Sequence, residues 1–129
     1  MVSFDRHRRL RSSAAMRDLV RETHLAKSDL IMPVFVDATI TGKEAIDSMP
    51  GIYRFGLDSI LDEIKEIVDL GIESIIIFGI PDHKDDLGTG AWEADGIVQQ
   101  AIRKIKAAYP DLIVIADTCM CEYTSTGHC

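Results

Sequence analysis

The sequence predicts an α/β protein with a parallel sheet. Three short apolar runs of strand type alternate with two amphipathic helical segments, so each strand is joined to the next through a helix. All three cysteines of the 129-residue chain lie within its last eleven residues, directly after the third strand. The alternation predicts the fold class, and the cysteines mark the segment in which chemistry is expected.

The first half of the chain is predicted to form a strand, a loop and a helix. Residues 30–36 are an apolar run in which Pro33 removes one backbone donor, as in an edge or irregular strand. Residues 37–56 contain isolated glycine turns and no sustained period, which predicts a long loop. Over residues 57–70, apolar side chains recur at steps of three and four, which predicts an amphipathic helix that ends at Gly71.

The second half repeats this order. Residues 74–80 are apolar on both faces, which is typical of a strand buried in a parallel sheet. A second loop over residues 81–95 leads into a helix whose apolar face spans residues 98–108 and which ends near Pro110. Residues 112–117 then repeat the pattern of a buried strand.

Two parallel architectures fit this order of elements. A doubly wound nucleotide-binding fold requires a short glycine-rich turn after its first strand, and neither G-x-G-x-x-G nor G-x-x-x-x-G-K-[ST] occurs in the chain. A (β/α)₈ TIM barrel instead carries its chemistry on long loops that follow the strands. The two long loops favour the barrel, so we expect residues 28–129 to form its first βαβαβ units.

The charge distribution separates a basic N-terminal arm from an acidic body. Residues 1–27 contain seven Lys or Arg and three Asp or Glu, whereas residues 28–129 contain seven and eighteen. The arm lacks interleaved aromatic residues and the body would repel phosphates, so we expect no nucleic-acid partner. We expect an extended arm that packs on an acidic surface of this chain or of a neighbouring subunit.

The location is predicted from what the sequence lacks. It has no apolar run of about 18 residues, and its first residues lack the apolar segment of a secretion signal. We therefore expect a cytoplasmic protein with no membrane partner. An odd number of cysteines in such a chain favours reduced thiols that bind metal or react.

The cysteines have the spacing of a metal site. Cys119 and Cys121 project from the same side of an extended segment, and a loop of small polar residues can return Cys129 to them. Thiolates select zinc, and three protein ligands leave its fourth position open, as in catalytic sites. His128 is a candidate for that position, although a residue adjacent to a ligand usually points away. The alternatives are three unconnected thiols and a redox pair.

The cysteine segment also carries a family resemblance. The stretch "DTCMCEYTSTGHC" resembles the zinc motif of porphobilinogen synthase, also called 5-aminolevulinate dehydratase. Similar stretches occur along the whole chain, among them "RHRRLR", "RDLVRET", "LIMPVFV", "SMPGIYR", "FGIP" and "PDLIVIAD". Two positions are noted against the motif: Thr126, where a histidine is common, and Glu122, where Pro or Glu occurs. Neither removes a cysteine ligand.

The resemblance implies a homooctameric TIM-barrel lyase of heme (porphyrin) biosynthesis that condenses two 5-aminolevulinate molecules into porphobilinogen. It implies that Cys119, Cys121 and Cys129 bind zinc, that Asp117 is a catalytic carboxylate, and that the full-length enzyme also uses magnesium. It further implies that arm residues contact a neighbouring subunit. The candidates for this contact are Arg6, His7, Arg8, Arg9 and Arg11.

The resemblance also implies two Schiff-base lysines on later barrel strands. None of the six lysines in this sequence follows an apolar strand directly. We therefore expect this sequence to be the N-terminal portion of the enzyme, truncated in the metal loop, and inactive as a 129-residue chain. The alternative is a non-catalytic zinc-binding fragment or interaction module.

Overall fold

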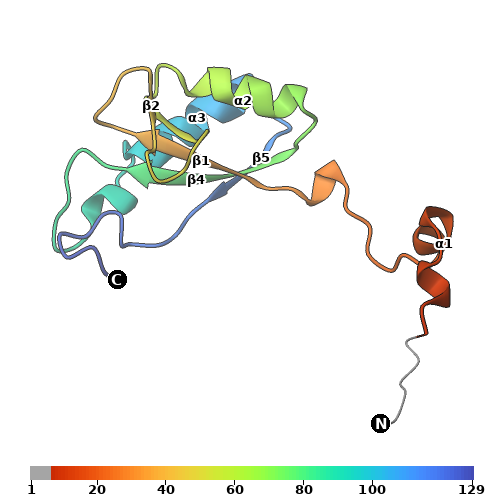
Figure 1. Cartoon of the computed structure of the whole chain (residues 1–129). Coiled ribbons are helices and arrows are strands. Elements are labelled where there is room, and N and C mark those ends of the chain that lie inside the picture. The colour runs from red at the N-terminus through yellow and green to blue at the C-terminus, as the bar shows by residue number, and fades with distance from the viewer. Residues whose placement is uncertain (1–6) are drawn as a thin grey trace, which may run out of the picture.

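The fold is a mixed five-stranded sheet with two helices on one face (Figure 1). The computed structural model describes residues 7–129. The strands lie in the order β2-β3-β1-β4-β5, in which β2 is antiparallel to β3 and the other neighbours are parallel. Their bounds are β1 Met32–Asp37, β2 Lys43–Ala45, β3 Tyr53–Phe55, β4 Ser74–Ile80 and β5 Ile113–Ala116.

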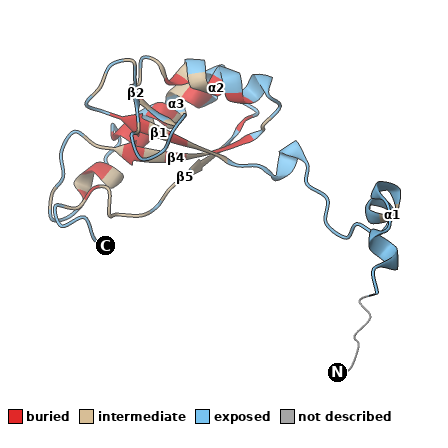
Figure 2. Ribbon diagram, in the orientation of Figure 1, coloured by how far each residue is buried: buried red, intermediate tan, exposed pale blue. Residues whose placement is uncertain are grey.

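The core lies between the sheet and the helices α2 (Ile60–Asp69) and α3 (Ile97–Ala108), where Figure 2 shows the buried residues. Alternate side chains of β1 and β4 point into it, because successive residues of a strand face opposite sides. Members of the core include Val34, Val36, Ile60, Ile64, Ile75, Ile77, Ala101 and Ile105. The predicted strands and helices are present, although α2 begins at Ile60 rather than at residue 57. Two details differ: β1 is the central strand despite Pro33, and β5, expected as a buried strand, is an exposed edge strand.

The opposite face of the sheet is only partly covered. Phe35 and Phe78 lie side by side on it, with their rings stacked at a centroid distance of 5.5 Å. Both are half-buried, and Ile113 at the edge strand is 56% exposed. Within residues 7–129, no helix covers this apolar surface in the way that α2 and α3 cover the core face.

The prediction of a loop over residues 37–56 was wrong, and the sheet is mixed, although the three predicted strands β1, β4 and β5 are parallel as expected. The segment contains the short strands β2 and β3, which form a hairpin beside β1. Arg54 on β3 pairs with Glu44 on β2 at 2.6 Å and with the buried carboxylate of Asp37 at 3.2 Å. Three-residue strands held by ion pairs have no apolar period, so the pattern of hydrophobicity could not reveal them.

The N-terminal arm extends away from the body (Figure 1). It contains the short helix α1 (Ala14–Leu19), whose first turn is capped by the Ser13 hydroxyl, and 3₁₀ turns at Arg9–Arg11 and Lys27–Asp29. Its described residues are almost all exposed (Figure 2). Residues 1–6, including the candidate contact Arg6, lie outside the described part of the chain.

The arm joins the body at Lys27, whose ammonium group donates a hydrogen bond to the carbonyl oxygen of Leu70 at 2.6 Å.

In the described range, none of the helices combines the length and the apolar character needed to cross a membrane.

Candidate metal centre

The candidate site lies where the parallel strands end. Strands β1, β4 and β5 are neighbours and run in the same direction, so the segments that follow them share one edge of the sheet. Asp117 directly follows β5, and its backbone N–H donates to the carbonyl oxygen of Ile77 on β4 at 3.2 Å. The cysteine loop therefore begins from a fixed point on the sheet.

A tight turn then reverses the chain between the cysteines. The carbonyl oxygen of Met120 accepts from the backbone N–H groups of Tyr123 at 3.0 Å and Thr124 at 3.1 Å. Gly127 has φ of 69°, a left-handed conformation that glycine adopts without a steric cost, and its N–H donates to Thr124. These two turns return Cys129 toward the start of the loop.

The turns bring all three thiols together. The Sγ atom of Cys129 lies 3.4 Å from that of Cys121 and 3.9 Å from that of Cys119. All three Sγ atoms lie within 4.8 Å of one another, and none of the three cysteines forms a disulfide. Tetrahedral zinc with bonds of about 2.3 Å holds its sulfur ligands about 3.8 Å apart. The donor set therefore fits a zinc ion.

The close approach of the thiols changes their acidity. The backbone N–H of Cys121 acts to lower the pKa of Cys119, but the Cys121 thiol, burial and the Cys129 thiol together raise that pKa to about 11. Hydrogen bonds from the thiols of Cys121 and Cys119 lower the pKa of Cys129. A bound cation would favour the thiolate form of these side chains.

Two carboxylates lie next to the thiols. One oxygen of Asp117 accepts from the backbone N–H of Cys119 at 3.3 Å. Single donor atoms of Asp117, Cys119 and Glu122 also lie within 4.8 Å of one another. Asp117 is thus located beside the cysteines, where it was expected. Glu122 was not predicted as a site residue, although it follows Cys119 by three positions.

The fourth position of the cysteine cluster is not matched by His128. Within residues 7–129, the groups of side chains close enough to share a metal ion are the three cysteines and the set of Asp117, Cys119 and Glu122. The loop instead uses the backbone oxygen of His128, which accepts from the hydroxyl of Thr124 at 3.0 Å.

The loop after β4 supports the cysteine loop. Asp85 and Thr124 form a bridge in which the Asp85 N–H donates to the carbonyl oxygen of Tyr123 at 3.2 Å. Ser125 N–H in turn donates to the carbonyl oxygen of Asp85 at 2.9 Å. The Tyr123 ring is buried, and it packs beside Gly90 of the same supporting loop.

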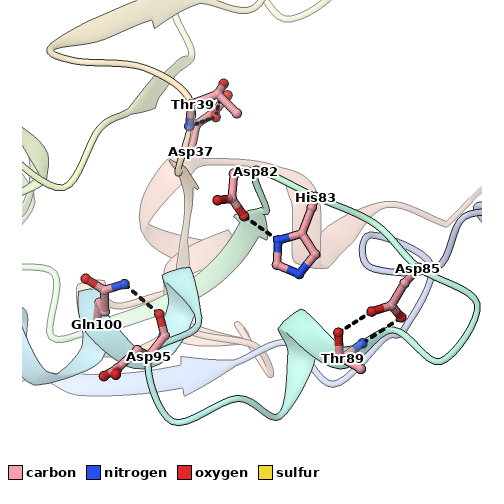
Figure 3. Close-up of polar contacts among 8 residues, drawn as sticks. All are labelled: Asp37, Thr39, Asp82, His83, Asp85, Thr89, Asp95 and Gln100. Carbon is pink, nitrogen blue, oxygen red and sulfur yellow. Dashed lines mark hydrogen bonds and ion pairs between the residues drawn. The ribbon is translucent and has the colours of Figure 1, made fainter.

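The supporting loop is itself rigidly hydrogen-bonded (Figure 3). The Asp85 carboxylate accepts from the backbone N–H groups of Leu87 at 2.9 Å and Thr89 at 3.0 Å, and from the Thr89 hydroxyl. These hydrogen bonds lower the pKa of Asp85; the bond from the Thr89 hydroxyl has the largest effect, and the bond from the Thr89 N–H has the next largest. The anionic side chain thus fixes the backbone on which the cysteine loop rests.

A small cavity of about 160 Å³ lies between this loop and the start of α3. Asp82, His83, Asp95 and Gln100 contribute to its lining. Figure 3 shows the contact between the Asp82 carboxylate and His83 Nδ1, which are 2.7 Å apart. This contact raises the pKa of the imidazole. The thiol cluster does not line this cavity.

Comparisons with known proteins give one consistent family. The model of the delta-aminolevulinic acid dehydratase family matches residues 4–129. Delta-aminolevulinic acid dehydratases of Staphylococcus aureus, including that of strain N315, are 56% identical over 128 residues, or 99% of this chain. The chain spans 40% of the length of these relatives.

A solved structure has the same fold. It is the delta-aminolevulinic acid dehydratase (porphobilinogen synthase) of Toxoplasma gondii in complex with the reaction product porphobilinogen. The match has a TM-score of 0.88 and 34% sequence identity, and it covers 98% of this chain and 36% of the other. With the arrangement of strands and cysteines described above, these matches show that the chain belongs to the delta-aminolevulinic acid dehydratase family.

Proposed function

We propose that the full-length protein condenses two molecules of 5-aminolevulinate into porphobilinogen, in the biosynthesis of heme and other porphyrins. The convergence of three thiols at the carboxyl edge of the sheet is the observation that carries this proposal. It is supported by membership of the family and by the product bound in the Toxoplasma gondii relative.

Zinc is the metal that the donor set favours. Soft thiolates select it among divalent ions, and the sulfur separations of 3.4 and 3.9 Å are close to those of a tetrahedral site. In our proposal Cys119, Cys121 and Cys129 hold the ion. When bound, zinc supplies a Lewis acid that polarises a carbonyl group or holds an amine.

Asp117 is proposed as the catalytic carboxylate beside this centre. Its hydrogen bond from the Cys119 N–H fixes the side chain at the strand end, half-buried and next to the thiols. From there a carboxylate can hold a cationic amine or move a proton at its oxygen. The resemblance assigns the two Schiff-base lysines, which activate ketones as iminium ions, to barrel strands outside this sequence.

The remaining proposals concern the assembly. We propose that residues 28–129 supply the first units of a (β/α)₈ barrel, whose interior lies on the side of Phe35 and Phe78. The basic arm, residues 1–27, whose described residues are almost all exposed, is proposed to contact a neighbouring subunit in a cytoplasmic homooctamer. The uncovered sheet face and the projecting arm support this arrangement, because both are surfaces that further elements would cover.

The experiment that tests the function is reversible metal removal from the reduced full-length protein. We expect a chelator to abolish porphobilinogen formation from 5-aminolevulinate, and we expect added zinc to restore it. Turnover that persists without bound zinc would overturn the proposed metal role. Zinc binding without any product formation would favour the alternative of a non-catalytic zinc-binding module.

A further inference from the structure

We propose that Asp85, on the loop after β4, is a positioning residue of the metal centre. It holds the backbone of the cysteine loop in the conformation that returns Cys129 to the other two thiols. This inference rests on the proposed zinc site and adds to it a residue that does not touch the metal. Groups that orient metal ligands are themselves determinants of metal affinity.

The first observation is the place at which the two loops join. The N–H of Asp85 donates to the carbonyl oxygen of Tyr123 at 3.2 Å, and its carbonyl oxygen accepts from the N–H of Ser125 at 2.9 Å. Both partners lie in the segment between Cys121 and Cys129, which must turn back to close the thiol cluster. A rotation of the Asp85 backbone would therefore break both bonds and release the middle of that segment.

The second observation is the direction of the Asp85 side chain, which turns back on its own loop (Figure 3). Its half-buried carboxylate accepts from the N–H groups of Leu87 and Thr89, at 2.9 and 3.0 Å, and from the Thr89 hydroxyl. Aspartate stabilises turns in this way, by accepting from backbone N–H groups a few residues further along the chain. The side chain therefore holds in place the residue whose backbone binds the cysteine loop.

Side-chain packing joins the same two loops. A methyl group added at Gly88 would lie 2.7 Å from the methyl carbon of Met120, and one added at Gly90 would lie 3.3 Å from the Tyr123 ring. Gly88 also has φ of 63°, a left-handed conformation that favours glycine. The turn that Asp85 stabilises is therefore shaped to receive the segment of the cysteine loop that Asp85 binds.

Asp86 is the competing candidate for this role. Its carboxylate accepts from the Ser125 hydroxyl, so it also joins the two loops. Both of these side chains are exposed, and water can replace either partner of such a bond at little cost. Asp85 instead binds the cysteine loop through its backbone, which its half-buried carboxylate fixes. The positioning role therefore belongs to Asp85.

The test compares zinc affinities of the reduced full-length protein and its variants by competition with a chromogenic chelator. We expect Asp85→Ala to weaken zinc binding at least about tenfold. Asp85→Asn should stay within about threefold of the wild type, because its amide oxygen can accept from both N–H groups and its amide nitrogen can donate to the Thr89 hydroxyl. This variant lacks the negative charge, so an affinity as low as that of Asp85→Ala would reduce the effect to electrostatics and overturn the positioning role.

Asp82→Ala is the matched control. It removes a carboxylate from the same loop, one that contacts His83 rather than the backbone of the turn, and it should change zinc affinity less than about twofold. A loss as large as that in Asp85→Ala would show that any carboxylate of this loop has the same effect, and it would overturn the specific role of Asp85.

A second measurement does not depend on variants that fold. If the bonds of Asp85 strengthen zinc binding, zinc must strengthen those bonds by the same factor, because coupling between binding equilibria is reciprocal. In the wild-type protein we expect zinc to slow hydrogen exchange of the Asp85 and Ser125 N–H groups about tenfold or more. Slower exchange in the cysteine loop without any change at Asp85 would overturn the inference.

The outcomes separate this inference from the proposal on which it rests. If the wild-type protein binds no zinc, the proposed metal centre itself fails. If the wild-type protein binds zinc and Asp85→Ala binds it equally well, only the role of Asp85 fails.

Discussion

The thiol of Cys129 lies close to those of both other cysteines. Cys119 and Cys121 lie on either side of Met120, where the turn after β5 begins. The site therefore depends on a residue ten positions away from Cys119 that returns through Gly127. The three proposed ligands could be named from the sequence, because C-x-C and a later cysteine already indicate a thiolate site. The proximity of Glu122 could not be predicted in this way, since it results from the turn geometry.

Replacing one thiol tests the proposed ligand set. We expect Cys121→Ser to weaken zinc binding by at least about tenfold, because a hydroxyl is a poor ligand compared with a thiolate. Competition with a chelator under reducing conditions measures this change. Thr118→Ser is the control, since it alters an exposed residue of the same loop and removes no proposed ligand. Equal affinities for both variants would refute the assignment of Cys121.

Removing the charge of Asp117 separates catalysis from metal binding. We expect Asp117→Asn in the full-length enzyme to retain zinc but to lower kcat by about a hundredfold or more, because an amide cannot accept a proton. The amide oxygen can still accept from the Cys119 N–H, so the loop should keep its shape. Steady-state kinetics with zinc analysis measures both effects. An unchanged kcat would remove Asp117 from the catalytic residues.

At the scale of elements, strand β4 connects the core to the site through Gly79. A methyl group added there would lie 2.5 Å from a Val98 methyl carbon in α3 and 2.6 Å from the Tyr123 hydroxyl. Because Gly79 has no side chain, α3 and the cysteine loop can both pack closely against the strand at this position. The sequence "SIIIFGI" predicts the strand but not this contact, which depends on two distant segments.

This packing leads to a stability prediction. We expect Gly79→Ala to lower the free energy of unfolding by about 1–3 kcal/mol, because the methyl group overfills the space between Val98 and Tyr123. We also expect weaker zinc binding, since Tyr123 anchors the cysteine loop. Urea unfolding and chelator competition measure the two effects. The exposed helix substitution Ala107→Ser is the control and should change stability by less than about 0.5 kcal/mol. No loss of stability in Gly79→Ala would contradict the tight packing described here.

Sequence patterns predicted the long elements well because their apolar residues face one core. The strand at Ser74–Ile80 and the helix at Ile97–Ala108 lie where periodicity indicates them. The hairpin of β2 and β3 was missed because it is held by Arg54 and its two carboxylate partners rather than by apolar burial. Ion pairs between short strands leave no period in a single sequence.

At the scale of the whole molecule, the two faces of the sheet differ. One face is closed by α2 and α3, while the other presents the stacked rings of Phe35 and Phe78 and the exposed edge residue Ile113. Apolar sheet surfaces and free strand edges favour association with other polypeptide segments, either of the same protein or of another copy. The basic arm projects from this unit without contacts along most of its described length.

A polypeptide restricted to these 129 residues should therefore associate and be catalytically inactive. We expect light scattering to detect species larger than the 14.3 kDa chain, because the uncovered apolar face of the sheet and its free strand edges favour association between copies. We expect no porphobilinogen in a product assay, because the proposed Schiff-base lysines are not among its residues. The full-length protein is the positive control. Measurable turnover by the 129-residue polypeptide would contradict the assignment of those lysines to later strands.

The most direct measurement is zinc X-ray absorption spectroscopy of the reduced full-length protein. We predict one bound zinc with three sulfur neighbours at about 2.3 Å and a single lighter neighbour. In the triple variant that replaces Cys119, Cys121 and Cys129 with Ser, the sulfur signal should vanish together with porphobilinogen formation. A protein that forms porphobilinogen with no zinc, or with zinc bound only by nitrogen and oxygen, would contradict the three-thiolate centre.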